Sequence, residues 1–229
     1  MDEAPIEPAA PATGAAPAAA VDAPVGSGAP VEVKASARPL GWLIELAKTI
    51  ALTLIIFFAV QTFIAQPFQV QMYSMEHTFE PGDYVLVDKL SVRWDGYSRG
   101  DVVVFHPPEN VTADAEPYIK RVIGEPGDTV ELRDGLVYVN GVQLQEPYLY
   151  TGEDGLPQPT DPADEDSWVV PDGSLFVMGD HREASADSRV FGPIAIDSVI
   201  GRGALRYWPL GKIGFITAPT YEGIPAPAP

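Results

Sequence analysis

The sequence predicts a mostly β protein: an antiparallel, coiled-sheet or barrel-like domain that follows one N-terminal transmembrane helix. No charged residue lies between Lys48 and Glu76, and this stretch is strongly apolar. About 20 apolar residues are enough for a helix to cross a bilayer. Beyond Pro67 the pattern changes to short strand-like runs separated by turn residues, and no helical period of useful length appears after Ala65.

The N-terminal part of the chain, residues 1–38, is rich in Ala, Pro and Gly and has few large apolar side chains. Such a segment cannot bury enough apolar surface to offset the entropy of ordering its backbone. We therefore expect a disordered tail over residues 1–38, followed by the transmembrane helix over residues 39–66.

A cleaved secretory signal, a buried core helix and an interfacial helix are alternative interpretations of the apolar run. A cleaved signal begins with a short basic segment and ends at small residues, whereas here a long tail comes first and Phe63 stands where a small residue is needed. The downstream domain is too small to enclose a core helix on all sides, which favours the membrane span.

The basic residues near the span predict its orientation. Lys34, Arg38 and Lys48 precede or begin the span, whereas the first basic residue after it is Lys89. Because positively charged flanks favour the cytoplasmic side, we expect a single-pass protein of the plasma membrane with a cytoplasmic N-terminus and an extracytoplasmic domain.

The extracytoplasmic domain is expected over residues 67–217, with strand-like runs at 84–92, 101–107, 118–124, 129–144, 174–180 and 199–208. Asp134-Gly135 and Asn140-Gly141 indicate tight hairpins. The tetrapeptide Glu-Pro-Gly-Asp occurs at 80–83 and 125–128, and Pro followed by Gly fits the centre of a type II turn. Residues 151–167 are predicted to form an acidic surface loop, and residues 218–229 a disordered tail.

Composition excludes several classes of site. The chain has 32 acidic and 14 basic residues and a net charge of -18, which disfavours a nucleic-acid partner because phosphates would be repelled. It has no cysteine, so disulfides, thiolate nucleophiles and Cys-ligated metals are absent.

Chemistry is expected near Ser74, in the stretch VQMYSMEHTF. A serine nucleophile needs a neighbouring base. His77 lies only three residues away and outside any nucleophile-elbow motif, which disfavours a triad based on histidine. A lysine serves as a base near neutral pH only when burial keeps it uncharged. Lys120, within an apolar strand-like run, meets this requirement, and Lys89 has a similar setting, so the residues alone leave both open.

The order of several blocks resembles the bacterial type I signal peptidases, which are membrane-bound serine proteases with a Ser-Lys dyad. The blocks are SMEHTF with EPGDYVLVDKL, then RGDVVVF, YIKRVIGEPGDTVELRDGLVYVNG and MGDHREASADSRVFGPI. The resemblance extends over most of the chain from the span onward. It implies the signal-peptidase fold for the β domain and no metal or organic cofactor.

The resemblance also implies roles for individual residues. Ser74 matches the nucleophile, Lys120 the general base, and Ser185 the hydroxyl that hydrogen-bonds and orients the lysine. The charged residues that match those holding the site together are Arg121, Asp180, Asp187 and Arg189. This sequence departs from the family at three motif positions, where His77, Phe79 and His181 replace Pro, Leu and Asn. Met72 stands where some members have a serine that assists the oxyanion hole, so the Ser74 backbone N–H or another donor must serve.

The implied function is removal of N-terminal signal peptides from exported preproteins, with small residues one and three positions before the cut. Its partners are preprotein signal peptides, the lipid bilayer and the neighbourhood of the secretion translocon. A self-cleaving regulator with the same dyad is disfavoured by the acidic charge and the absence of a DNA-binding segment. The alternative function is not enzymatic: a membrane-tethered β domain with a binding or scaffold role.

Overall fold

The computed structural model describes residues 39–108, 111, 116–162 and 165–225. The predicted tail over residues 1–38 and the last four residues of the chain therefore lie outside the described residues.

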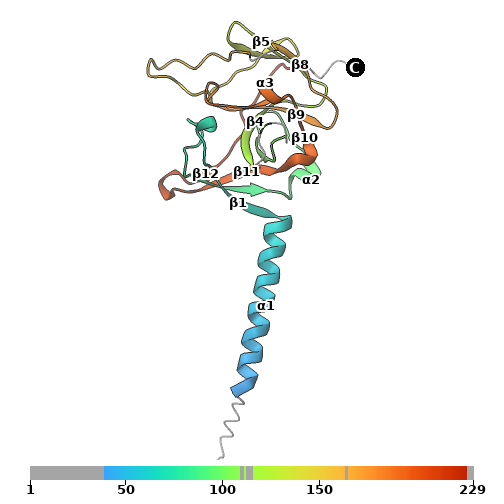
Figure 1. Cartoon of the computed structure of the whole chain (residues 1–229), viewed down its shortest axis with the longest axis vertical. Helices are drawn as coiled ribbons and strands as arrows, with labels where there is room; N and C mark the ends of the chain where they lie inside the picture. The colour runs from blue at the N-terminus through green and yellow to red at the C-terminus, as the bar shows by residue number, and fades with distance from the viewer. Residues whose placement is uncertain (1–38, 109–110, 112–115, 163–164, 226–229) are drawn as a thin grey trace, which may run out of the picture. The chain divides into compact units, whose positions relative to one another are not determined.

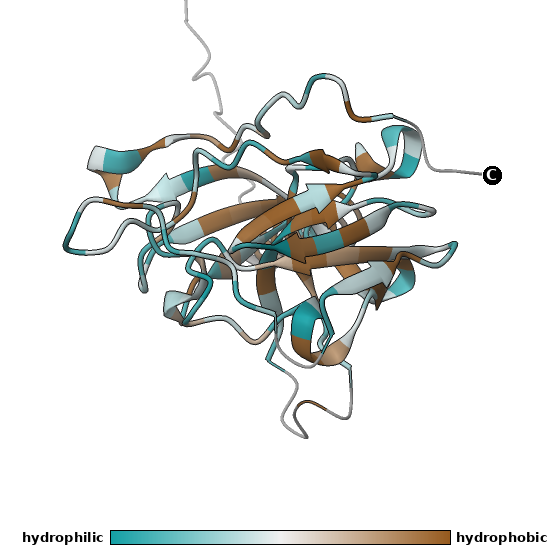
Figure 2. Ribbon diagram, turned by 90° about the horizontal axis from the view of Figure 1, so that it is seen from above, coloured by the Kyte–Doolittle hydropathy of each residue, from teal (hydrophilic) through white to brown (hydrophobic). Residues whose placement is uncertain are grey.

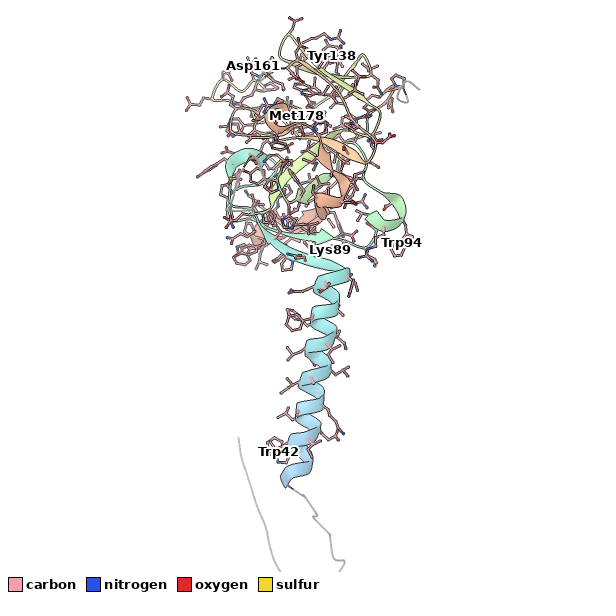
Figure 3. The ribbon with its side chains drawn as sticks, turned by 45° about the vertical axis from the view of Figure 1, so that its right-hand side comes forward. Trp42, Lys89, Trp94, Tyr138, Asp161 and Met178 are labelled. Carbon is pink, nitrogen blue, oxygen red and sulfur yellow. The ribbon has the colours of Figure 1, made fainter. Side chains whose placement is uncertain are left out.

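Helix α1 runs from Pro39 to Phe63, and from Gly41 onward it is long and apolar enough to cross a membrane. The side chains from Gly41 to Val60 are all exposed, and Figure 3 shows them projecting from the helix. A helix that is apolar on every side and not covered by protein is typical of a membrane span. The helix ends before the predicted boundary at residue 66, because Ala65 already pairs with a neighbouring strand.

The described part of the chain after α1 is built mainly from strands, with only short helices (Figure 1). The strands are β1 Ala65–Gln69, β2 Tyr84–Asp88, β3 Val102–Phe105, β4 Tyr118–Gly124, β5 Thr129–Arg133, β6 Leu136–Val139, β7 Val142–Gln143, β8 Ser167–Val169, β9 Ser174–Met178, β10 Ile194–Ala195, β11 Val199–Trp208 and β12 Gly214–Phe215. The short helices are α2 Val92–Asp95, α3 Ser188–Phe191, η1 Tyr73–Met75, η2 Ile196–Ser198 and η3 Leu210–Lys212.

Two antiparallel sheets form the β domain. The larger, eight-stranded sheet has the order β1-β2-β11-β3-β4-β9-β10, with β12 paired to β11. The four-stranded sheet has the order β7-β6-β5-β8, and its β5 and β8 lie at the far side of the β domain from β1 (Figure 1). The mostly β, antiparallel fold class predicted from the sequence is thus confirmed.

Tight turns follow the local sequence closely. Asp134, Gly135, Asn140 and Gly141 all have positive φ, between 51° and 79°, as two-residue hairpin turns require. The two Glu-Pro-Gly-Asp segments form equivalent turns: in each, Gly has positive φ and the Asp N–H donates to the Glu carbonyl at 3.0 Å. The recurrence of this tetrapeptide therefore reflects one turn geometry used twice.

The core extends on both sides of the larger sheet. The four residues of β3 are all buried: Val102 and Val104 pack in one apolar cluster, and Val103 and Phe105 in another. Alternating side chains of a strand point to opposite faces, so this sheet is covered on both faces near its centre. Figure 2 shows apolar residues concentrated along the strands and polar residues in the connections. A side chain placed on a central strand is thereby removed from water.

The prediction of a disordered tail from residue 218 is wrong for residues 218–225. Tyr221 packs against the core cluster beneath the four-stranded sheet, and its hydroxyl donates to the Tyr148 hydroxyl at 3.3 Å. The Asn140 side chain donates to the Pro225 carbonyl at 2.9 Å. An aromatic side chain can bury enough apolar area to hold a segment whose composition is otherwise typical of a tail.

Candidate active site

Ser74 lies in the single turn η1, which follows β1 and Val70. Met75, the next residue, is fully buried with Val70 and Phe79 and fastens this turn to the core. The Phe79 N–H donates to the Met75 carbonyl at 2.7 Å, which closes the turn. Because both flanks of Ser74 are held by apolar packing, its side chain has a defined position, and only 2% of the residue is exposed.

Lys120 lies on β4, between β3 and β9 in the larger sheet. Its amine nitrogen Nζ is 2.7 Å from Ser74 Oγ, although the two residues are 46 positions apart in the sequence. The amine also donates to the Ile119 carbonyl at 3.1 Å and lies 5.1 Å from the centre of the Tyr118 ring. Of the two lysines left open by the sequence, the structure brings Lys120 to the serine, whereas Lys89 donates to the Gln61 carbonyl at 3.3 Å.

Burial controls the charge of Lys120. The residue is 1% exposed, and burial lowers the pKa of its amine from 10.5 to about 8. The carboxylates of Asp187 and Asp180 raise this pKa, and the Arg189 guanidinium lowers it, but removal from water outweighs them. A substantial fraction of Lys120 is therefore uncharged in mildly alkaline solution, as a base for a serine hydroxyl requires.

Arg121 and Asp180 form a buried ion pair beside these two residues. Arg121 Nε and Nη2 donate to the two carboxylate oxygens of Asp180 at 2.8 and 2.6 Å, and a third hydrogen bond goes from Arg121 to the Gly100 carbonyl. Thr78, four residues after Ser74, donates to Asp180 and accepts from Arg121. This network joins β4, the segment after β9 and the loop that carries Ser74.

Asp187 and Arg189 form the second predicted pair. Arg189 Nε and Nη2 donate to the Asp187 carboxylate at 2.9 Å each, and the Gly179 N–H donates to the same carboxylate at 3.0 Å. Burial alone would raise the pKa of Asp187, but the Arg189 contacts outweigh it and hold the pKa below its usual value. Asp187 also begins α3 by accepting from the Arg189 N–H, so this pair shapes the backbone of the loop.

Ser185 does not make the hydrogen bond to Lys120 that the resemblance implies. Its Oγ is buried and makes no hydrogen bond of ordinary geometry among the described residues, but it lies close enough to the Asp187 carboxylate to help lower the pKa of that group. The Lys120 amine instead contacts Ser74 Oγ and the Ile119 carbonyl. Ser185 nevertheless lies close to the site, because a side chain built on Gly179 would approach both Ser185 Cβ, at 2.6 Å, and the Ser74 carbonyl oxygen, at 2.5 Å.

The two histidines near Ser74 connect the loops around it. His181, whose backbone N–H donates to the Ser74 carbonyl at 3.1 Å, has its ring nitrogen Nδ1 2.9 Å from Glu76 Oε2. The His181 ring also stacks on Tyr150 with 4.0 Å between ring centres. His77, at positive φ, has Nδ1 2.9 Å from the Leu149 carbonyl oxygen, whereas the contact to Ser74 Oγ comes from Lys120. The sequence motif did not reveal these contacts, since their partners lie far away in the chain.

A further buried cation, Arg182, was missed by sequence reasoning. It is fully buried, pairs with Glu146, and donates to the hydroxyl of Thr160 and to the Gly179 carbonyl. Thr160 is buried although it belongs to the segment predicted to be a surface loop. Arg182 belongs to the motif segment GDHREASADSR, and this was the available signal. Its partners Glu146 and Thr160 cannot be read from local sequence, because they lie more than 20 residues away.

A pocket of about 260 Å³ opens beside Ser74. Its wall comes from β1, Met72, Ile119 and the segment Glu116–Pro117. Met72 is half exposed and supplies no hydrogen-bond donor from its side chain. The Ser74 N–H donates to no acceptor within the described residues, so it is available to a bound group. Within those residues, no group of three or more His, Asp or Glu side chains is arranged to hold a metal.

Comparison with known proteins identifies the family of this chain. The model of the family "Signal peptidase, peptidase S26" matches residues 43–208. A signal peptidase IB from Staphylococcus aureus strain MRSA252 is 37% identical over 187 residues, which cover 76% of this chain and 93% of that protein. A signal peptidase I from Leptolyngbya laminosa is 35% identical over 77% of this chain and 85% of the relative.

A crystal structure of a signal peptidase I from Enterococcus faecalis is 35% identical, covers 46% of this chain and 95% of that chain, and has a TM-score of 0.39. The family match spans the apolar helix, the Ser74 turn, β4 and the loop that carries Asp187. The chain therefore belongs to the signal peptidase family, peptidase S26, and is a serine endopeptidase.

Proposed function

We propose that this chain removes N-terminal signal peptides from exported preproteins, with Ser74 as nucleophile and Lys120 as general base. The observation that carries the proposal is the 2.7 Å separation between Lys120 Nζ and Ser74 Oγ, at a site where the pKa of the lysine falls to about 8. Geometry and protonation state therefore both favour proton transfer from the serine to the lysine.

The proposed reaction is acyl transfer in two halves. Ser74 Oγ attacks the scissile carbonyl carbon while its proton passes to Lys120 Nζ, and the resulting ammonium then protonates the leaving amine. Water attacks the ester, Lys120 accepts a proton from that water, and the proton returns to Ser74 as the C–O bond breaks. The buried pairs Arg121–Asp180 and Asp187–Arg189 position the loops around the dyad and keep its charged neighbours compensated.

Two features support binding of an extended peptide. β1 is the last strand at one edge of the larger sheet, so its free backbone groups can pair with a substrate strand. The pocket beside Ser74 is lined by Pro67, Phe68 and Ile119, which suit an apolar side chain next to the cut.

The unoccupied Ser74 N–H supports a role for this group as the oxyanion donor. The preference for small residues one and three positions before the cut rests on the family resemblance.

A cleavage assay on a preprotein tests the dyad. Ser74→Ala and Lys120→Met should each lower kcat by about a thousandfold or more, because nucleophile and base act as one unit. Ser98→Ala and Lys212→Met are matched controls: both side chains are exposed and neither lies at the site, so these variants should process at the parental rate. If Ser74→Ala and Lys120→Met cleave as well as the parent, the dyad is excluded. A parent that does not cleave would favour the binding or scaffold role.

Membrane anchoring through α1, with the N-terminus in the cytoplasm, is part of the proposal. It is supported by the length and exposure of the helix and by the basic residues that precede it. This topology places the dyad at the outer face of the membrane, near exported chains that emerge from the translocon. Because the chain has no cysteine, a single introduced cysteine reports its own side of the membrane.

In intact cells, a membrane-impermeant maleimide should label Glu183→Cys on the β domain but not Ser27→Cys in the N-terminal segment. Both variants should react after the cells are lysed, which controls for loss of the thiol. Labelling of Ser27→Cys and protection of Glu183→Cys in intact cells would reverse the proposed orientation.

A further inference from the structure

The segment from Lys89 to Trp94 forms the boundary of two pockets at the C-terminal end of α1. A pocket of about 630 Å³ is lined by Thr62, Gln66, Lys89 and Arg93, together with residues of β11 and its neighbours. An apolar pocket of about 370 Å³ is lined by Ile64, Leu86, Leu90 and Trp94. Figure 3 shows Lys89 beside the end of α1 and Trp94 on the same side of the β domain.

The first pocket holds uncompensated positive charge in a strongly acidic protein. Among the described arginines, Arg93 alone forms no ion pair and no side-chain hydrogen bond, while each of the others pairs with a carboxylate. These pairs are Arg99–Asp128, Arg121–Asp180, Arg133–Glu131, Arg182–Glu146, Arg189–Asp187, Arg202–Asp101 and Arg206–Asp83. Arg93 is thus the one arginine of the described residues without a carboxylate partner, in a chain that has 32 acidic residues.

Lys89 adds a second cation to the same pocket. Its amine donates to the Gln61 carbonyl at 3.3 Å in the last turn of α1 and forms no ion pair among the described residues. His106 lines the pocket as well, and Asp197 is the one carboxylate in its wall. Asp197 is exposed, and no ion pair joins it to either cation in the described part of the chain. The pocket therefore presents two positive side chains that have no carboxylate partner among the described residues.

The second pocket is mainly apolar. Trp94 is 77% exposed, which is unusual for the largest apolar side chain, and Ile64, Leu86 and Leu90 lie beside it. An indole next to lysine and arginine at the end of a span is the arrangement that suits a membrane interface, where the ring lies among headgroups and the cations meet phosphates. One short segment thus provides cations to one pocket and apolar side chains to the next.

We propose that these paired pockets bind a phospholipid with a net negative headgroup, whose phosphate lies between Lys89 and Arg93 and whose acyl chain follows the apolar pocket under Trp94. This inference rests on the proposed membrane anchoring, since it requires the end of α1 to lie at the bilayer surface. The bound lipid would hold the β domain close to the membrane, which a protein with a net charge of -18 does not achieve by general attraction.

Native mass spectrometry of the full chain in a neutral detergent tests the site, with dioleoyl phosphatidylglycerol and dioleoyl phosphatidylcholine as probes. The parent should retain phosphatidylglycerol in preference to phosphatidylcholine. Lys89→Gln combined with Arg93→Gln should weaken phosphatidylglycerol retention by about tenfold, because each cation near the headgroup contributes separately. Trp94→Ala should weaken retention of both lipids. The matched control, Arg133→Gln with Lys212→Gln, removes the same charge from exposed positions elsewhere and should retain phosphatidylglycerol as the parent does.

Equal retention of phosphatidylglycerol by the parent and the Lys89/Arg93 variant would overturn the proposal, as would equal retention of the two lipids by the parent. Millimolar inorganic phosphate should not displace the lipid; displacement would assign the pocket to a free anion instead. Cleavage of a soluble signal-peptide substrate in the same detergent should be unchanged by the Lys89/Arg93 substitutions. Loss of proteolysis in the parent would thus count against the proposed function, and loss of lipid selectivity against this site.

Discussion

Burial of Lys120 sets the pH at which its amine can act as a base. Its amine has a pKa of about 8 in the folded protein, so the fraction that can accept the Ser74 proton increases up to that pH. We expect kcat/KM to rise about tenfold per pH unit below pH 8 and to level off above it. A pH–rate profile of preprotein cleavage measures this limb. A rate that is constant from pH 6 to 9 would contradict the assignment of Lys120 as the base.

The same burial makes Lys120 costly for stability. The folded chain releases the proton near pH 8 and the unfolded chain near 10.5, so the unfolded state binds more protons between these values and stability increases as pH rises through this window. Below about pH 8 the folded state is destabilised by the full free energy of burying the protonated amine. Lys120→Met should therefore be inactive yet more stable at pH 7, by up to about 3 kcal/mol.

Thermal unfolding of Lys120→Met and of the parent, at pH 7 and at pH 10.5, measures this cost. The difference in stability should shrink at the higher pH. A variant that is less stable than the parent at pH 7 would show that the amine contributes more through its hydrogen bonds than burial removes.

Gly179 lies between the turn that carries Ser74 and the loop that carries Ser185. A methyl group there would lie 2.5 Å from the Ser74 carbonyl oxygen, which is backbone and cannot turn aside. Gly179→Ala should displace the nucleophile and lower kcat by about a hundredfold, since small misplacements of reacting groups have large effects on rate. Gly211→Ala is the control, because nothing lies within 4 Å of its added methyl group. Parental kcat in Gly179→Ala would mean that the loops tolerate this displacement.

The buried pair Arg121–Asp180 ties together three elements: β4, the connection after β9 and the turn that carries Ser74. Removing one partner leaves the other charge buried without compensation, which costs about 3–5 kcal/mol. Asp180→Asn should therefore lower the melting temperature markedly and also reduce cleavage, because Thr78 loses its acceptor.

The matched comparison for Asp180→Asn is Glu131→Gln, which breaks an exposed pair with Arg133 and should change stability by less than about 1 kcal/mol. Circular dichroism melts in detergent distinguish the two. If both substitutions have the same small effect, the Arg121–Asp180 network is not a structural element of the site.

The apolar helix and the β domain are proposed to have separate tasks. A chain that begins at Gln61 retains β1 and the whole of the β domain, so it should still cleave a soluble peptide. A membrane anchor raises the effective concentration of the enzyme beside a substrate in the same bilayer. Processing of a preprotein in proteoliposomes should thus fall by about a hundredfold in the shortened chain, while the rate on the peptide is unchanged. If the shortened chain processes the preprotein as fast as the full chain does, α1 does not have the proposed purpose.

Features that depend on near neighbours in the chain could be read from the sequence. The Asn-Gly and Asp-Gly hairpins, the two Glu-Pro-Gly-Asp turns and the long uncharged run appear in the structure at the predicted positions, because their conformations follow from local sterics and local polarity. The order of the motif blocks indicated the family, and Ser74 and Lys120 with it.

The protonation of Lys120 and the partners of each polar group were decided only by the tertiary structure. The pKa of an amine depends on the atoms that exclude water from it, and for Lys120 these come from segments distant in the sequence. For the same reason the sequence did not foresee that the Lys120 amine contacts Ser74 and the Ile119 carbonyl and not Ser185, that His181 contacts Glu76, or that Lys89 donates to the last turn of α1. Local sequence specifies turns and strands, whereas packing between distant segments specifies which side chains share one dry site.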